Sequence, residues 1–192
     1  PQVRGIGLMT HSNGWTLDDP SFEPFYARAA QLGLPVVLHP QLEDPPPTYR
    51  DWALAASLAP MVSSSLGVLR LILSGLLDRV PGLEVIVPHL GGTIPFLIQR
   101  LLDLSGKGGA EHDLLHYCRN RLYFDTCSYH PPALRCAAET VGAGRLVLGS
   151  DYPFRGGLGR CVDDVDRSGF SPADQEAILG GTATRWFAPG RE

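Results

Sequence analysis

The stretch LEVIVPHLGGTIPFLIQRLLDL, residues 83–104, contains the unit from which the fold is built. Its first part, residues 83–89, is a short apolar run rich in β-branched side chains, which is typical of a buried strand. Two glycines follow soon after His89, and Thr93 with Pro95 then marks the start of a segment with helical spacing. The stretch therefore predicts one strand that leads directly into one helix.

The same alternation extends over the rest of the chain. Four further apolar runs are predicted strands, at residues 3–9, 35–39, 121–126 and 145–151. Segments with helical spacing lie at 19–33, 66–82, 131–144 and 171–181. Strands that alternate with helices of this length indicate βαβ units and a parallel sheet, and therefore an α/β fold. The near-continuous apolar character of the runs predicts that both faces of the sheet are covered.

The composition is that of an ordinary globular domain, with 44% hydrophobic and 19% charged residues among 192. No linker divides the chain, so we expect residues 1–192 to form a single domain. The net charge of −4 and the absence of Lys/Arg runs exclude nucleic acid and an anionic membrane as expected partners. The four cysteines form no CxxC pair, which predicts free thiols and a cytoplasmic location.

Polar side chains follow three of the predicted strands. The second strand ends at His39, the third at His89 and the fifth at Asp151. Since the carboxyl ends of parallel strands meet at one edge of a sheet, we expect these side chains to gather there. Two imidazoles and a carboxylate suit a divalent cation, and they equally suit a set of one ligand, one general base and one bridging carboxylate.

Each of these residues also has a plainer structural explanation. A histidine after a strand is often held by a backbone carbonyl, HLGG at 89–92 can be a tight turn, and Asp151 can serve as a turn or cap residue. The coincidence at three strand ends favours the functional interpretation. His112 and His116 have the spacing of a metal pair on a helix, but they are more simply interpreted as a solvated face. His11, which follows the first strand, is expected to line the mouth of the site.

Longer motifs resemble one family. They are THSNGWTLDDPSFEPFYARAAQLGLPVVLHP (10–40), LILSGLLDRVPGLEVIVPHLGGTIPFLIQR (71–100), YFDTCSYHPPALRCAAETVGAGRLVLGSDYPF (123–154) and ILGGTATRWF (178–187). These motifs, in this order, are similar to the amidohydrolase-related branch of the amidohydrolase superfamily, which includes aminocarboxymuconate-semialdehyde decarboxylase and γ-resorcylate decarboxylase. The resemblance implies a (β/α)8 barrel that holds one divalent metal, with zinc expected and manganese as the alternative.

The resemblance also implies roles for individual residues. His39 matches a metal ligand, His89 a catalytic histidine, and Asp151 an aspartate that contacts both the metal and the reaction centre. Arg100 matches an arginine that reaches the site of a neighbouring subunit and holds the substrate carboxylate, which implies a homodimer. Trp52 matches an aromatic wall of the substrate pocket. With His11, Arg100 and Trp52 are the predicted substrate-binding residues.

One departure from the family is large. The family begins with an HxH pair on its first strand, and no HxH occurs in these 192 residues. The five predicted strands match the fourth to eighth strands of the barrel, so we expect an N-terminal segment carrying three strands and HxH to lie outside this sequence. We expect the present chain alone not to be a competent enzyme.

The function predicted for the complete protein is metal-dependent, non-oxidative decarboxylation of a small aromatic or unsaturated carboxylic acid. Two alternatives remain open. The same residues could support metal-dependent hydrolysis of a lactone, an ester or a C–C bond. The chain could also be a non-catalytic, truncated scaffold.

Overall fold

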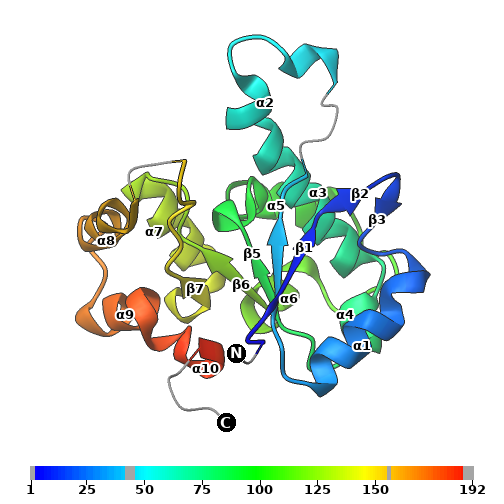
Figure 1. Cartoon of the computed structure of the whole chain (residues 1–192). Coiled ribbons are helices and arrows are strands. Elements are labelled where there is room, and N and C mark those ends of the chain that lie inside the picture. The colour runs from blue at the N-terminus through cyan, green and yellow to red at the C-terminus, as the bar shows by residue number, and fades with distance from the viewer. Residues whose placement is uncertain (1–2, 42–45, 155–156, 188–192) are drawn as a thin grey trace.

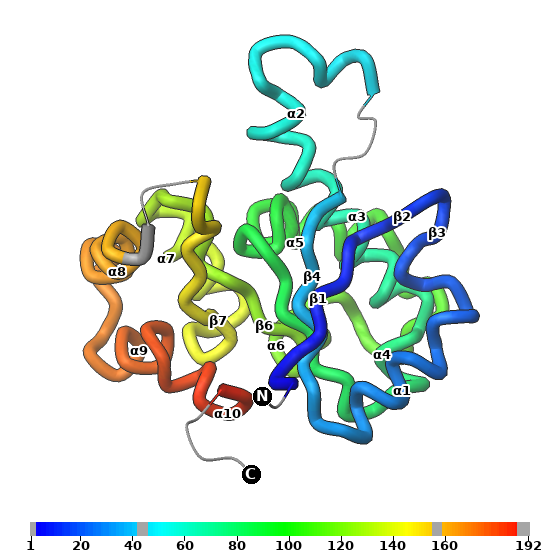
Figure 2. The backbone as a smooth tube through the Cα atoms, viewed as in Figure 1, coloured from blue at the N-terminus to red at the C-terminus, as the bar shows by residue number. Residues whose placement is uncertain are grey.

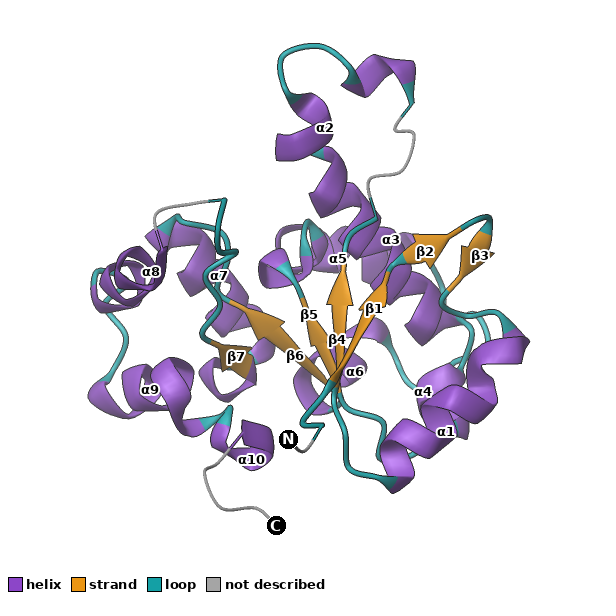
Figure 3. Ribbon diagram, in the orientation of Figure 1, coloured by secondary structure: helices purple, strands orange, loops and turns teal. Residues whose placement is uncertain are grey.

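The centre of the molecule is a parallel sheet of five strands (Figure 1, Figure 3). The computed structural model describes residues 3–41, 46–154 and 157–187. The strands, in their order across the sheet, are β1 (Ile6–Met9), β4 (Val36–His39), β5 (Val85–Val87), β6 (Leu122–Asp125) and β7 (Leu146–Val147). All five strands predicted from the sequence are therefore confirmed, as is the α/β class.

Helices connect the strands and also follow the last strand, β7, and most of them pack against one face of the sheet. The main ones are α1 (Glu23–Gln31), α3 (Ala59–Leu73), α5 (Ile94–Leu104), α6 (Leu114–Asn120), α7 (Pro131–Val141) and α8 (Gly157–Asp166). Shorter ones are α2 (Leu54–Ser57), α4 (Leu76–Arg79), α9 (Pro172–Glu176) and α10 (Thr184–Phe187), with single turns η1 (Pro20–Phe22), η2 (Pro47–Tyr49), η3 (His89–Gly91), η4 (Ala143–Arg145) and η5 (Ala177–Gly181). Burial of their apolar side chains against the strands forms the main core.

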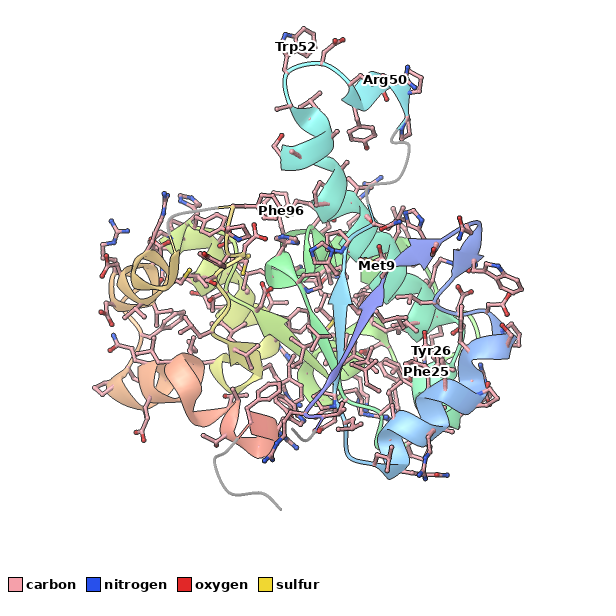
Figure 4. The ribbon with its side chains drawn as sticks, viewed as in Figure 1. Met9, Phe25, Tyr26, Arg50, Trp52 and Phe96 are labelled. Atoms are coloured by element: carbon pink, nitrogen blue, oxygen red, sulfur yellow. The ribbon has the colours of Figure 1, made fainter. Side chains whose placement is uncertain are left out.

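The opposite face of the sheet is covered only in part, so the prediction that both faces are covered is wrong for β1 and β4. In β4, Val36 and Leu38 are buried whereas Val37 and His39 are exposed. In the neighbouring β1, Met9 is 45% exposed and lies beside His39 (Figure 4). Because side chains alternate along a strand, this pattern places one face of β1 and β4 in the core and leaves the other open.

The lower end of this second face is closed by α10. Trp186 is buried in a small cluster with Ile86, Tyr123 and Val147, and its ring meets the Tyr123 ring edge-on, with the ring centroids 4.6 Å apart. Arg185 forms an ion pair with Glu84 at 2.8 Å. The end of the chain as described thus returns beneath the sheet, close to the N-terminus (Figure 2).

Helix α3 begins at Ala59, seven residues before the predicted start at residue 66. The segment SSS at 63–65 argues against a helix, because serine side chains compete for backbone hydrogen bonds. In the structure, the hydroxyl of Ser64 donates to the Pro60 carbonyl at 2.9 Å, and that of Ser65 to the Met61 carbonyl at 2.7 Å. These bonds to the preceding turn let serine remain inside a helix.

The segment between β4 and α3 projects from the body as an arm, which we define as residues 46–58 (Figure 1). It contains η2 and α2, and Arg50 and Trp52 lie at its outer end (Figure 4). Trp52 and Ala53 both have positive φ, 52° and 59°, and the Trp52 side chain is 87% exposed.

A two-stranded hairpin follows β1, formed by β2 (His11–Ser12) and β3 (Trp15–Thr16). The sequence did not predict this hairpin, nor α8, whose ten residues include two glycines. None of the described helices is both long enough and apolar enough to cross a lipid bilayer.

Candidate active site

The carboxyl ends of the five parallel strands bring several polar residues to one edge of the sheet. His39 and Asp125 are the last residues of β4 and β6. His89 opens the turn that follows β5, and Asp151 follows β7 after a short extended segment. The predicted gathering of polar groups at this edge is present, and Asp125 is an additional member of it.

The turn after β5 has an unusual backbone. Four consecutive residues have positive φ: His89 at 55°, Leu90 at 53°, Gly91 at 78° and Gly92 at 63°. A Cβ on Gly92 would lie 2.2 Å from the Met61 carbonyl oxygen, so only glycine fits there. The turn is thus pressed against α3, and this contact directs the chain from the strand into α5.

A pocket of about 320 Å³ lies beside this turn. Its polar side chains include those of Ser57, His89, Cys127, Ser128, Tyr129 and Asp151. Its apolar wall includes Met61, Leu90, Pro95, Phe96, Ala133 and Ala137. The pocket therefore combines a small polar cluster with an apolar wall, as is common in sites for small organic ligands.

Two buried polar atoms in this pocket have no hydrogen-bond partner among the described residues. They are Nδ1 of His89 and Oγ of Ser128. Because a buried donor or acceptor without a partner costs free energy, such atoms call for an explanation. Both atoms belong to side chains that line the pocket, so a ligand bound there could satisfy them.

Asp151 is held by a tyrosine on the neighbouring segment. The Tyr129 hydroxyl donates a hydrogen bond to Oδ2 of Asp151 at 2.9 Å, and both residues have positive φ, 57° and 52°. Burial and the negative charge of Asp151 raise the pKa of the Tyr129 phenol well above its ordinary value. Tyr129 therefore remains protonated at neutral pH and acts as a lasting donor to this carboxylate.

Asp125, the last residue of β6, contacts the turn that follows β5 and does not line the pocket. Its Oδ1 accepts hydrogen bonds from the backbone N–H of His89 at 2.7 Å and of Cys127 at 3.0 Å. Burial raises the pKa of the Asp125 carboxyl, whereas the charge of His89 and these two donors oppose the rise. Asp125, Tyr129 and Ser128 were not predicted from the sequence as site residues, although Asp125 ends an apolar strand just as His39 does.

His39 lies at the same edge of the sheet, but it does not line this pocket. Its Nδ1 is 2.9 Å from the carbonyl oxygen of Pro40. This contact assigns the proton to Nδ1 and leaves the lone pair of Nε2 free to accept a hydrogen bond or bind a metal. The structure thus brings His89 and Asp151 into one pocket and places His39 outside it.

The three predicted substrate-binding residues also lie outside the pocket of this chain. His11 is half-buried on the hairpin, where it lines hollows bounded by Trp15 and Thr16. Arg100 is exposed on α5, one turn beyond Phe96, and Trp52 stands at the tip of the arm. Their roles in substrate binding stay predictions.

A metal ion would need more ligands than these. Among residues 3–41, 46–154 and 157–187, no three His, Cys, Asp or Glu side chains lie close enough to hold one ion. His39 Nε2 and the Asp151 carboxylate have the right chemistry for a divalent cation. These two side chains would supply only some of the ligands that a divalent cation needs.

The turn at His89 is fastened to α3 through Ser65, which suggests a stability test. The Thr93 N–H donates to Ser65 Oγ at 2.9 Å in a buried setting. We expect Ser65→Ala to lower the free energy of unfolding by about 1–2 kcal/mol, because that N–H loses its acceptor. Urea unfolding measures this change, with Ser57→Ala on the exposed arm as the matched control. An equal effect of the two substitutions would contradict the fastening role.

Comparison with known proteins places this arrangement in a family. The amidohydrolase family model matches residues 1–188. A 2-amino-3-carboxymuconate-6-semialdehyde decarboxylase from Dictyostelium discoideum is 29% identical over 95% of this chain. A 2-keto-4-carboxy-3-hexenedioate hydratase from a Sphingobium species is 26% identical over 89% of it.

A solved structure supports the same assignment. The dihydroxybenzoic acid decarboxylase from a Polaromonas species, with bound manganese and the inhibitor 2-nitroresorcinol, superimposes with a TM-score of 0.85 and 25% identity. That match covers 97% of this chain and 62% of the solved chain, and the chain spans 53% and 51% of the two curated relatives. The five βα units are consistent with part of a barrel of this type. Because the family model matches nearly the whole chain, the chain belongs to the amidohydrolase family.

Proposed function

We propose that the protein, at its natural full length, is a decarboxylase that releases carbon dioxide from a small aromatic or unsaturated carboxylic acid. The observation that carries this proposal is the pairing of His89 and Asp151 in one pocket, where Nδ1 of His89 is buried without a partner among the described residues. The decarboxylases among its relatives support the same reaction class.

The reaction needs a proton at a fixed place. The bond between the carboxylate carbon and the adjacent carbon breaks, carbon dioxide leaves, and the electron pair that remains on the substrate carbon takes up one proton. His89 and Asp151 hold and transfer this proton, with Tyr129 fixing the orientation of the Asp151 carboxylate. The apolar wall formed by Met61, Leu90 and Phe96 accommodates the body of the substrate and limits access of water.

A divalent ion, zinc or manganese, supplies electrophilic polarisation of the substrate when it is bound. His39 and Asp151 are the donors that this chain contributes to such an ion. The bond from His39 Nδ1 to the Pro40 carbonyl supports this assignment, because it orients the imidazole and leaves Nε2 available.

The assembly of the active protein is part of the proposal. Arg100 would hold the substrate carboxylate in the site of a second subunit, since its long side chain is exposed and bidentate pairing suits a carboxylate. Trp52, exposed at the tip of the arm, would form an aromatic wall of the substrate pocket in the assembled protein. This role of Arg100 predicts a homodimer. A cytoplasmic location and a role for His11 at the mouth of the site are further predictions.

Addition of water to the substrate is the second candidate function, and the hydratase among the relatives favours it. The same two residues could transfer a proton during hydration, or during hydrolysis of a lactone, an ester or a C–C bond. A non-catalytic scaffold is the third possibility.

Product analysis separates these functions. The full-length protein, loaded with manganese or with zinc, is incubated with hydroxybenzoates and carboxymuconates, and each product is identified by mass spectrometry. We expect loss of carbon dioxide from at least one acid. The methyl esters of the same acids are the matched controls, since only a hydrolase converts them. Gain of water would establish the second candidate, and absence of any product with either metal would contradict an enzymatic role.

A further inference from the structure

The carboxylate of Asp125 joins two of the strand ends that form the site. Asp125 ends β6, the strand between β5 and β7. Its Oδ1 accepts the N–H of His89, which follows β5, and the N–H of Cys127, which follows β6. One oxygen atom therefore holds the backbone of two residues, His89 and Cys127, that both line the pocket.

The third strand end is packed directly against the same side chain. Gly149 leads from β7 to Asp151, and a Cβ at this position would lie 2.9 Å from Cβ of Asp125 and 3.2 Å from its Cγ. The N–H of Gly149 also donates to Oγ1 of Thr126 at 3.1 Å. Contact between the Gly149 backbone and Asp125 is thus possible only because Gly149 lacks a side chain.

The hydrogen bond to His89 is significant because of the conformation of that residue. His89 has φ of 55°, a region that residues with a Cβ rarely adopt, and Leu90 follows with 53°. Such a backbone persists only where the surroundings hold it. The hydrogen bond from the His89 N–H to Oδ1 of Asp125, 2.7 Å long, acts directly on this strained residue.

We propose that Asp125 is a positioning residue, which holds the backbone of His89 in the left-handed conformation that directs its imidazole into the pocket. This inference rests on the proposed function, because it assigns the benefit to the proton transfer by His89. Asp125 does not line the pocket, so it acts through His89 and not on the substrate.

The test compares two substitutions of nearly equal size in the full-length, metal-loaded protein. Asp125→Asn keeps an oxygen that can accept both N–H groups, whereas Asp125→Leu keeps the volume and removes the acceptor. We expect Asp125→Leu to lower kcat for release of carbon dioxide by about 10–100-fold with KM nearly unchanged. Asp125→Asn should keep kcat within a few-fold of the wild type. Equal losses in the two variants, or no loss in Asp125→Leu, would overturn the proposal.

Asp113→Leu is the control, since Asp113 also accepts a backbone N–H, that of His116 at 2.8 Å at the start of α6, and does not line the pocket. This variant should lower the melting temperature without lowering kcat. A fall in kcat equal to that of Asp125→Leu would show a general effect of stability and would overturn the proposal. If Asp125→Leu does not fold, Asp125→Ala takes its place, with the same expected loss of kcat.

A second measurement does not depend on activity. Hydrogen–deuterium exchange at the His89 amide should be slow in the wild type and in Asp125→Asn, and at least ten-fold faster in Asp125→Leu or Asp125→Ala. Exchange at the wild-type rate in the variants without an acceptor would overturn the positioning role. If the wild type acts on none of the acids but the amide exchanges as expected, the proposed function fails while the hold of Asp125 on His89 stands.

Discussion

Substitution of Asp151 by asparagine in the full-length protein is expected to lower kcat for release of carbon dioxide by about 10³-fold. Asparagine tolerates the positive φ of this position, and its side-chain oxygen can still accept the hydrogen bond from Tyr129. The structure is therefore retained while the negative charge and the site for the proton are lost. Steady-state kinetics on a converted acid measure the change, and thermal unfolding reports on the fold.

Tyr129→Phe is the companion variant. It removes the hydroxyl that orients the Asp151 carboxylate but leaves the charge, so we expect a smaller loss of about ten-fold. Wild-type turnover by Asp151→Asn would exclude a catalytic role for Asp151, even if the protein proves to be a decarboxylase.

Truncation of Trp186 to alanine is expected to have the largest effect on stability, a loss of about 3–5 kcal/mol in the free energy of unfolding. Trp186 is only 4% exposed, and its removal would leave a cavity against Ile86, Tyr123 and Val147. It would also remove the hydrogen bond from the indole N–H to Glu84. The expected fall in melting temperature is roughly 10 °C, which calorimetry or circular dichroism can measure.

Phe187→Ala is the control for this effect. Phe187 belongs to the same short helix but is 47% exposed, so we expect a change smaller than half of that caused by Trp186→Ala. Similar losses from the two substitutions would show that α10 contributes as a whole and that Trp186 has no special place.

The sheet could be predicted from the sequence because its strands are apolar runs bounded by turn residues. Periodicity and composition identify such runs, for example at residues 85–87 and 122–125. The helices between them require a parallel sheet. The positional rule for polar strand ends also identified His89 and Asp151, which the structure places in one pocket. These features depend on neighbours along the chain.

Features that depend on particular side-chain hydrogen bonds, on backbone conformation or on contacts between strands were not predictable from periodicity and composition. The helical state of Ser64 and Ser65 depends on bonds of their hydroxyls to the preceding turn. The position of Trp52 at the tip of an arm depends on two residues with positive φ that carry side chains. The role of Asp125 as an acceptor appears only when the ends of β5 and β6 lie side by side.

The left-handed turn at residues 89–92 has a consequence for how this protein can adapt to heat. Two of its residues carry side chains, and each costs about 1 kcal/mol in this conformation. Glycine at position 90 would remove part of this cost, but it would also loosen the segment that carries the imidazole. Selection for thermostability therefore has freedom in the helices and in α10, whereas at this turn a gain in stability is expected to come at the expense of turnover.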